Sequence, residues 1–240
     1  MTAETDLLYL SDAYQRTFEA TVVAVDGARI ALDRTAFYAT GGGQPNDTGT
    51  LDIGGTVGQV TDVSKDAGVV WHVLAEPAAC EVGQPVTGEI DWDRRHALMR
   101  THTAMHILCG VIWNEWGVPV TGGSMQPLSA RMDFEFDPLP ERFKERVQEM
   151  VAAEIAADRP VTVEFLGRDR ALVDAELIRT KTNLIPEGVT SVRVVDIVGL
   201  DKQADGGTHV ASTKEVGSLQ VTKTESKGKG FKRLRVQIGD

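Results

Sequence analysis

The sequence has only two cysteines among 240 residues, Cys80 and Cys109, and it has no long apolar run. Two cysteines cannot form the several disulfides that hold small secreted domains together. No stretch approaches the roughly 18 consecutive apolar residues that indicate a membrane-spanning helix. The first ten residues are acidic, and their apolar run is too short for a signal peptide. We therefore expect a cytoplasmic protein with no membrane partner.

Basic residues are also in the minority, with 25 Lys and Arg against 35 Asp and Glu, for a net charge of −10. Taken alone, this balance argues against a nucleic-acid partner, because Lys and Arg make most phosphate contacts. Apolar residues make up 42% of the chain, which excludes disorder over most of its length. A chain this long buries roughly 70% of its unfolded surface, so it can fold without a disulfide or a structural metal.

Residues 1–90 show the pattern of a small β domain, in which short β-branched runs are separated by Gly, Asp and Pro. The Asp26-Gly27 pair between Thr17–Val25 and Ala28–Leu32 predicts a hairpin. The other predicted strands are Gly49–Ile53, Thr56–Val63, Gly68–Leu74 and Gln84–Ile90. Strands at such close intervals predict a β-barrel-like domain.

Residues 91–240 mix helices and strands without regular alternation, which predicts fold class α+β and a second domain. Apolar spacing predicts a helix from Arg94 to Trp116, with Asp93 as its N-cap and Gly117 as its stop. The other predicted elements are helices at Pro140–Ala157 and near Arg170–Arg179, and strands at Val161–Leu166, Val192–Val198, Val216–Thr224 and Phe231–Ile238.

Two histidines, His102 and His106, lie four residues apart in the first predicted helix. Four residues turn a helix by about 400°, so the two rings lie on one face, one turn apart. This spacing is typical of helical zinc sites, although a polar core or a solvent-exposed face also produces it. His96 lies about 120° away around the helix and is expected to stay outside such a site.

A second segment, Asp205-Gly206-Gly207-Thr208-His209, offers two more ligands four residues apart. Its glycines allow a sharp turn, and an Asp-capped turn is the alternative interpretation. A metal ion needs three or four ligands, and two segments together can supply them. We therefore predict a metal site formed by His102, His106, Asp205 and His209.

Three consecutive glycines, Gly41 to Gly43, precede Gln44 and Pro45 in the β domain. Such a run predicts a loop with positive φ angles or close approach of another backbone, with a flexible loop as the alternative. A phosphate cradle is one use of this geometry. The absence of a following Lys-Ser or Lys-Thr pair excludes a nucleotide P-loop.

Five ordered stretches between residues 37 and 236 resemble the AlaX group of free-standing alanyl-tRNA editing proteins, which are relatives of the editing domain of alanyl-tRNA synthetase. They are FYATGGGQPNDTGTL (37–51), MRTHTAMHIL (99–108), GGSMQPLSARMDFEF (122–136), VRVVDIVGLDKQADGGTHVASTKEVG (192–217) and KTESKGKGFKRLRV (223–236). The glycine-rich element is similar to that of the medium-length members. The resemblance implies a β domain followed by an α+β editing domain of the threonyl/alanyl-tRNA synthetase second-additional-domain type.

The resemblance implies an ATP-independent trans-editing hydrolase that deacylates mischarged tRNA, mainly seryl-tRNA(Ala) and in some members glycyl-tRNA(Ala). The family binds zinc through an HxxxH and a CxxxH motif, which implies ligand roles for His102, His106 and His209. Asp205 stands at the cysteine position and replaces a soft thiolate with a hard oxygen. Zinc is the expected metal, with manganese or iron as alternatives. Both a monomer and a homodimer fit the sequence.

Other site roles are also expected under this resemblance. Backbone N–H groups of Gly206, Gly207 and Thr208 are candidate oxyanion donors, and the hydroxyls of Thr103 and Thr208 are candidates to bind a serine hydroxyl, with local capping as the alternative. The candidate contacts for tRNA or substrate are Gly41, Gly42, Gly43, Gln44, Gln126, Arg131, Lys227, Lys229 and Lys232.

Local charge modifies the first inference from the net charge. Residues 223–236 contain six Lys and Arg against one Glu, a local charge of +5, and Arg94, Arg95 and Arg100 form a second basic group. We expect phosphate contacts here, although a solvated basic hairpin is the alternative. Three other functions remain open: a non-catalytic tRNA-binding relative, a deacylase of seryl-tRNA(Thr), and a hydrolase of another ester or amide.

Overall fold

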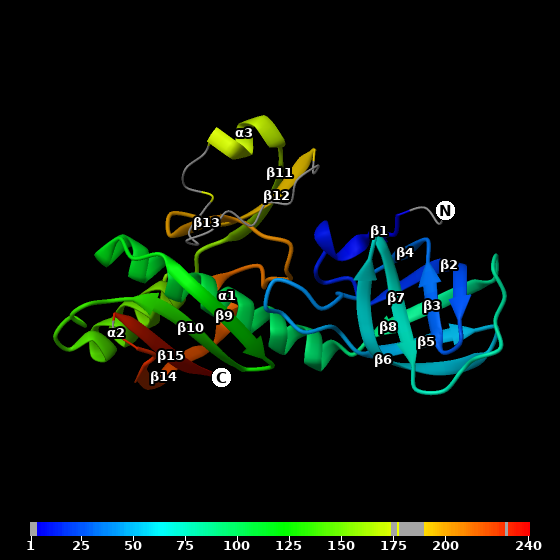
Figure 1. The fold of residues 1–240 in the computed structure, drawn as a ribbon, viewed down its shortest axis with the longest axis horizontal. Helices are drawn as coiled ribbons and strands as arrows, with labels where there is room; N and C mark the ends of the chain where they lie inside the picture. The colour runs from blue at the N-terminus through cyan, green and yellow to red at the C-terminus, as the bar shows by residue number, and fades with distance from the viewer. Residues whose placement is uncertain (1–3, 174–176, 178–189, 229) are drawn as a thin grey trace. The chain divides into compact units, whose positions relative to one another are not determined.

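The computed structural model describes residues 4–173, 177, 190–228 and 230–240 (Figure 1). Backbone contacts divide the chain into two compact units, Met1–Ala97 and Leu98–Asp240. The first unit is almost entirely β, and the second combines helices with two antiparallel sheets, which confirms the predicted α+β class. Within the described residues, no helix is both long and apolar enough to cross a membrane.

The first unit contains a closed barrel in the order β2-β3-β7-β6-β5-β8 (Figure 1). All six neighbouring pairs are antiparallel, and closure leaves no free edge. The strands are β2 (Thr17–Asp26), β3 (Arg29–Leu32), β5 (Gly49–Ile53), β6 (Thr56–Asp66), β7 (Val69–Leu74) and β8 (Pro85–Ile90). The short strands β1 (Asp6–Leu7) and β4 (Arg34–Thr35) pair in parallel. The 3-10 helix η1 (Leu8–Leu10) follows β1, and the glycine run follows β4.

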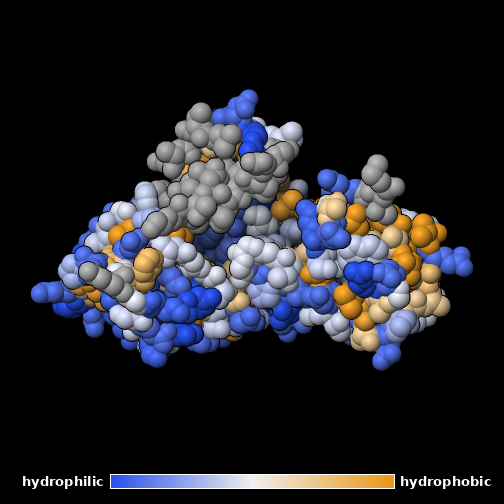
Figure 2. Space-filling view, viewed as in Figure 1, coloured by the Kyte–Doolittle hydropathy of each residue, from blue (hydrophilic) through white to orange (hydrophobic). Residues whose placement is uncertain are grey.

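Alternating sequence places the barrel core. In β8 the burial pattern alternates strictly, so Val86, Gly88 and Ile90 face inward while their neighbours face solvent. His72 is fully buried in this core and bonds Thr35 Oγ1 at 2.8 Å and Ile30 O at 3.1 Å. Burial lowers the pKa of His72 to about 4, so the ring is neutral at neutral pH. On the face shown in Figure 2, hydrophobic residues of the barrel unit lie in small groups among hydrophilic ones.

Helix α1 (Trp92–Trp116) is the long predicted helix, but its predicted N-cap, Asp93, is wrong. The helix begins at Trp92, two residues before the predicted start, and Asp91 Oδ1 accepts the N–H of Arg94 at 3.2 Å. The Asp-Trp-Asp sequence offers two carboxylates, and only the backbone geometry shows which one precedes the first turn. The helix ends at Gly117, whose φ of +66° confirms the predicted stop.

The second unit contains a four-stranded sheet in the order β14-β15-β10-β9 and a three-stranded sheet in the order β11-β12-β13 (Figure 1). The strands are β9 (Val120–Gln126), β10 (Ser129–Glu135), β11 (Val161–Gly167), β12 (Ser191–Ile197), β13 (Asp201–Ala204), β14 (Ser218–Ser226) and β15 (Phe231–Gly239). The sequence predicted β11, β12, β14 and β15. It missed the hairpin of β9 and β10, whose glycines and polar residues hide its alternation.

Two further helices lie in this unit, α2 (Phe143–Ala156) and α3 (Arg168–Val173), together with η3 (Thr213–Val216). The predicted apolar stripe of α2 is buried at Phe143, Val147, Val151 and Ile155, and this helix packs against β14. The predicted helix near Arg170–Arg179 is seen as α3, and most of its C-terminal part lies outside the described residues.

Candidate metal centre

The structure brings together the four predicted metal ligands, which are His102 and His106 on α1 and Asp205 and His209 after β13. One ligand atom from each residue lies within 4.8 Å of all the others. The three histidines are buried, and the rings of His102 and His209 stack with centroids 4.3 Å apart. Two segments separated by about 100 residues in sequence therefore form one site only through the fold.

Close packing of α1 on the β12–β13 turn positions the two ligand segments. A Cβ atom on Gly110 would lie 3.0 Å from both Asp201 Cβ and Leu200 Cγ, closer than side chains normally pack. Asn114 Nδ2 donates to Leu200 O at 3.1 Å and attaches the same turn to the helix. Glycine at position 110 thus lets the helix and its histidines approach the strand that leads to Asp205.

Asp201, at the start of β13, orients the imidazole ring of His106 through a hydrogen bond. His106 Nδ1 donates to Asp201 Oδ2 at 3.0 Å, and Gln203 Nε2 donates to the same oxygen at 2.7 Å. With Nδ1 used in this way, Nε2 of His106 remains for the cluster. Burial acts to lower the pKa of His106, but the hydrogen bond and charge of Asp201 outweigh it and raise the pKa.

Thr103 holds His209 in a similar way. Its Oγ1 lies 3.2 Å from His209 Nδ1 and accepts the N–H of Val210 at 3.2 Å. His209 Nε2 faces Asp205 Oδ2 at 2.9 Å. Burial lowers the pKa of His209 to about 4, against the opposing effect of Asp205, so its imidazole is neutral and suited to bind a metal.

Asp205 is the most connected member of the cluster. Its Oδ2 accepts the N–H of Gly207 at 2.7 Å, and its Oδ1 lies 3.7 Å from His102 Nε2. Arg193 Nη1 donates to Asp205 O at 2.9 Å. Desolvation acts to raise the pKa of Asp205, but His102 and His209 hold it well below its usual range, so the side chain is a carboxylate. The Gly207 N–H is therefore engaged with this carboxylate in the structure.

The donor set fits a divalent transition metal. Three imidazole nitrogens and one carboxylate oxygen are ligands of zinc, manganese and iron alike. Ligand atoms bound at ~2.1 Å to one tetrahedral ion lie ~3.4 Å apart, so the observed spread of 4.8 Å requires only a small contraction. His96 does not belong to this cluster, because its ring stacks on Trp92 with centroids 5.5 Å apart.

Two predicted substrate contacts lie on the β9–β10 hairpin. Its turn is attached to α1 by a hydrogen bond from the Leu128 N–H to Thr101 Oγ1 at 2.9 Å, one residue before His102. Gln126 is exposed at the end of β9, and Arg131 on β10 lies 3.4 Å from Asp133 Oδ2. Their roles in substrate binding stay predictions.

Ion pairs reduce the positive charge of the β14–β15 hairpin. Glu225 pairs with Lys223 at 2.6 Å and with Arg235 at 3.1 Å. Arg233 donates to both oxygens of Asp133 at 2.6 Å. Three of the six basic side chains in residues 223–236 are therefore paired with carboxylates, which the local net charge of +5 did not indicate.

The cations nearest the hairpin turn are Lys227 and Lys232, and neither forms an ion pair within the described residues. Lys232 Nζ donates to Ser226 Oγ at 2.8 Å. Lys229, the third predicted contact of the turn, lies outside the described residues. Phosphate binding by this hairpin therefore depends on its tip, and it remains a prediction.

The prediction that the second basic group, Arg94, Arg95 and Arg100, contacts phosphate is wrong for Arg95. This guanidinium is fully buried, and its Nε lies 3.0 Å from both carboxylate oxygens of Asp47. Arg100 Nε donates to Val216 O at 3.1 Å, so this side chain too is tied to its own unit. Charge can be counted from sequence, but burial cannot.

Comparison with known proteins identifies the family of this chain. A protein of Saccharolobus solfataricus named alanyl-tRNA editing protein AlaX-M is 39% identical over 235 residues, which cover 96% of this chain and 97% of the relative. A protein of the same name from Methanosarcina mazei is 36% identical over 245 residues, covering 98% and 97%. The chain belongs to the AlaX-M family of alanyl-tRNA editing proteins.

The AlaX-M chain also matches parts of tRNA synthetases. Residues 2–94 match the family described as tRNA synthetases class II (A), and residues 192–235 match the threonyl and alanyl tRNA synthetase second additional domain. An alanine–tRNA ligase of Pyrococcus abyssi is 36% identical over 240 residues, which cover 99% of this chain but 26% of the ligase. The predicted fold type is thereby confirmed, and the second match includes Asp205 and His209.

The glycine run of this AlaX-M chain is an ordered turn. Gly42 and Gly43 have φ angles of +57° and +86°, as a two-residue type I′ turn requires. Gly41 and Gln44 exchange backbone hydrogen bonds of 3.1 and 2.9 Å, and Tyr38 Oη donates to Gly41 O at 2.9 Å. The turn belongs to the first unit, and its contact with tRNA stays a prediction.

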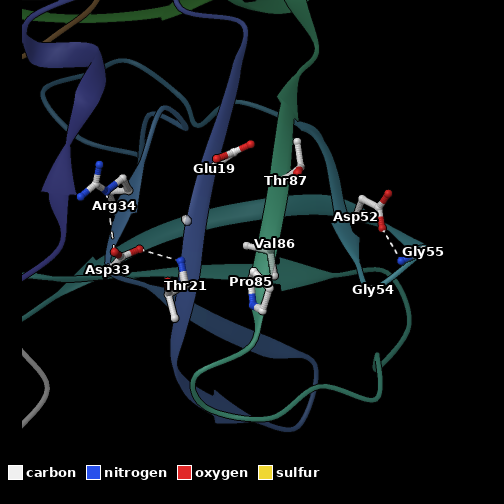
Figure 3. Close-up of a pocket in the computed structure, with 11 residues that line it drawn as sticks. Glu19, Thr21, Asp33, Arg34, Asp52, Gly54, Gly55, Pro85, Val86 and Thr87 are labelled. Carbon is white, nitrogen blue, oxygen red and sulfur yellow. Dashed lines mark hydrogen bonds and ion pairs between the residues drawn. The ribbon is translucent and has the colours of Figure 1, made fainter.

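A cavity of about 620 Å³ lies on the outside of the barrel and was missed at the level of sequence (Figure 3). Glu19, Asp33 and Asp52 line it, with the Thr21 and Gly55 N–H groups donating at 2.7 Å to Asp33 Oδ1 and Asp52 Oδ1. Asp52 caps a local turn, Asp33 bonds the backbone of β2, and the residues that line the cavity include no histidine or cysteine. It therefore offers no counterpart to the metal centre.

Proposed function

We propose that this AlaX-M protein hydrolyses the ester bond of mischarged tRNA, with seryl-tRNA(Ala) as its main substrate and glycyl-tRNA(Ala) as a second one. The observation that carries the proposal is the cluster of His102, His106, Asp205 and His209. This cluster lies in a chain whose relatives are named alanyl-tRNA editing proteins and cover nearly its whole length. The tRNA partner follows from the same relatives.

The four residues would hold a divalent metal, with zinc as the first expectation and manganese or iron as alternatives. When bound, such a metal polarises a carbonyl group and lowers the pKa of a coordinated water. Asp201 and Thr103 keep His106 and His209 in the tautomers that direct Nε2 to the cluster. The carboxylate of Asp205 supplies the one negative charge among the four ligands.

Discrimination between serine and alanine requires polar groups for the serine hydroxyl. Thr103 and Thr208 flank the ligands, and both are fully buried. A hydrogen bond to the substrate hydroxyl in such a dry site is worth ~1–3 kcal/mol, which corresponds to roughly 5- to 150-fold discrimination. Glycine lacks the hydroxyl, so it would be accepted by its size and cleaved more slowly.

The test is deacylation of seryl-, glycyl- and alanyl-tRNA(Ala) and of seryl-tRNA(Thr) by the wild type, by His102→Ala and by His209→Ala. We expect the wild type to cleave seryl-tRNA(Ala) and both variants to lose at least a hundredfold in rate. His96→Ala is the matched control, because His96 lies on the same helix and stacks on Trp92. Wild-type rates in both ligand variants would refute the proposal.

Three further functions are separated by the same assay, run with a simple ester as an additional substrate. A non-catalytic tRNA-binding relative, suggested by Asp205 in place of cysteine, would bind tRNA without cleaving any of the four substrates. Preferential cleavage of seryl-tRNA(Thr) would instead make the protein an editor for another tRNA. Hydrolysis of simple esters without tRNA would indicate a different substrate class, since the fold alone does not determine it.

The companion variant Asp205→Cys tests the ligand role of Asp205 directly. A thiolate binds zinc more selectively than a carboxylate does. We expect the purified variant to retain more zinc relative to manganese than the wild type, measured by elemental analysis after dialysis against both metals. Unchanged metal ratios would place Asp205 outside the coordination shell.

A further inference from the structure

The sheet face that carries the metal centre continues outward to an exposed apolar edge on β11. Backbone pairing aligns Phe165 on β11 with Arg193 on β12, and the Asp205 N–H donates to Arg193 O at 3.1 Å. Since paired residues of an antiparallel sheet share a face, Phe165, Arg193 and Asp205 form one row across this face.

The next row repeats the arrangement. Val163 on β11 pairs with Val195 on β12, which pairs with Gln203 on β13. One end of each row thus supplies the metal centre, with Asp205 as a ligand and Gln203 bonded to Asp201. The other end of each row is an apolar side chain of β11, and we call Val163 and Phe165 together the β11 ledge.

Burial changes sharply along these rows. Val195 is fully buried and Arg193 is 8% exposed, whereas Val163 is 40% exposed and Phe165 is 51% exposed. The face is therefore covered over β12 and open over β11. Contact of this phenylalanine and valine with water is unfavourable, so burying them against a partner would gain free energy.

The distance between the ledge and the metal centre suits one nucleoside. Adjacent strands lie ~4.8 Å apart, so the backbone of Phe165 lies ~10 Å from that of Asp205, with Arg193 between them. An aminoacyl ester on the terminal ribose at the cluster would place the attached base about this far away. The terminal base of tRNA is unpaired, and unpaired bases bind proteins largely by stacking on aromatic side chains.

We propose that the terminal adenine of the tRNA stacks on Phe165, with Val163 extending the β11 ledge, while its ester lies at the metal centre. The proposal rests on the proposed tRNA substrate and adds the residue that binds the base. Strand pairing with a second copy is disfavoured at this edge of the sheet, because Glu164 and Thr162 alternate with the apolar side chains along β11. Glu164 moreover pairs with Lys202 at 2.8 Å.

The experiment measures binding of uncharged acceptor-stem RNA, so it does not depend on hydrolysis. Two RNAs are compared, one ending in adenosine and one ending in an abasic nucleotide, each with the full-length wild type, Phe165→Ala and Phe165→Tyr. Stacking on an aromatic ring is worth ~1–3 kcal/mol per base, so we expect about tenfold tighter binding of the adenosine RNA by the wild type. Val57→Ala, a 60% exposed residue of the barrel, is the matched surface control.

Phe165→Ala should reduce the tenfold preference to less than twofold, and Phe165→Tyr should restore it, because tyrosine also stacks. Val57→Ala should keep the full preference. An unchanged preference in Phe165→Ala would overturn the proposal. Equal weakening of both RNAs by Phe165→Ala would also overturn it, because this result indicates general disruption. A loss of self-association by Phe165→Ala in sedimentation would overturn it as well, because this result indicates an interface between copies. Failure of wild-type deacylation would refute the proposed function alone, since this binding comparison would still report on stacking.

Discussion

Removal of the Asp201 carboxylate tests how this protein positions its candidate metal ligands. Asp201 accepts the Nδ1–H of His106 at 3.0 Å and the amide of Gln203 at 2.7 Å, and its side chain is fully buried. Asp201→Asn keeps the shape and an acceptor oxygen but removes the charge. Asp201→Ala removes both, and leaves the imidazole of His106 without its orienting partner.

The size of the effect follows from that hydrogen bond. A hydrogen bond to a charged group contributes ~1.5–3 kcal/mol, which corresponds to roughly 10- to 150-fold in metal affinity if the bond only orients the ligand. Losses of ~10- to 100-fold are typical when such outer partners of ligating histidines are removed. We expect Asp201→Asn near the lower end of this range and Asp201→Ala near the upper end.

The pH dependence separates orientation from general disruption. Asp201 raises the pKa of His106, and protonated His106 cannot bind a metal. As pH falls through this raised pKa, the wild type should lose metal affinity, and Asp201→Asn should lose it only at lower pH. The two affinities should therefore converge as pH decreases.

The assay is competition for zinc with a chromophoric chelator between pH 6 and pH 8, with circular dichroism as the check on folding. Gln203→Ala is the graded control, since it removes a neighbour of Asp201 but not the carboxylate, and it should cost less than Asp201→Asn. A folded Asp201→Ala variant with wild-type affinity and an unshifted pH profile would refute the reasoning.

Three other predictions concern the rest of the molecule. Arg95→Met leaves the Asp47 carboxylate buried and unpaired, so urea unfolding should show that the free energy of unfolding falls by ~3–5 kcal/mol. Arg29→Met breaks an exposed ion pair with Asp26 and should lower it by less than ~1 kcal/mol. The pKa of His72 is lowered to about 4 in the folded protein, so the unfolded chain binds a proton more readily as pH falls. The free energy of unfolding should therefore decrease by about 2 kcal/mol between pH 7 and pH 5, and His72→Gln should abolish this pH-dependent loss. Lys227→Glu with Lys232→Glu should weaken tRNA binding and reduce the magnitude of the logarithmic salt slope by about 2, while the same reversal at Lys144 and Lys214 on the same unit should leave the slope unchanged.

Much of the first unit could be predicted from local patterns. All six barrel strands lie where alternation and turn residues indicated them, because inward and outward positions differ at every second residue. The hairpin of β9 and β10 escaped prediction, since Gly122 and Gly123 interrupt its pattern. Strand pairing with β15 stabilises it, and such pairing leaves no trace in a local window.

In the candidate site, too, some residues could be predicted from local patterns and others could not. The four ligands were predicted from two short motifs, because helical and turn spacing limit where neighbouring side chains point. Asp201 and Gln203 were missed, although the alternation of Asp201, Gln203 and Asp205 along β13 and the residue that follows it was a usable signal. Arg95 was misassigned to a phosphate surface, because a sequence gives its charge without its buried partner.

By itself, the sequence determined the fold class, the family, the helix that carries two histidines and the two segments that meet at the metal centre. The fold class and the helix depend on composition and on periodicity over a few residues, the two segments on two short motifs, and the family on a resemblance carried by five ordered stretches. Only the tertiary structure decided which carboxylate orients His106, which cations of the hairpin are already paired, and that Phe165 shares a sheet row with Asp205. Each of these depends on strand register and burial, which are set by contacts between residues far apart in the chain.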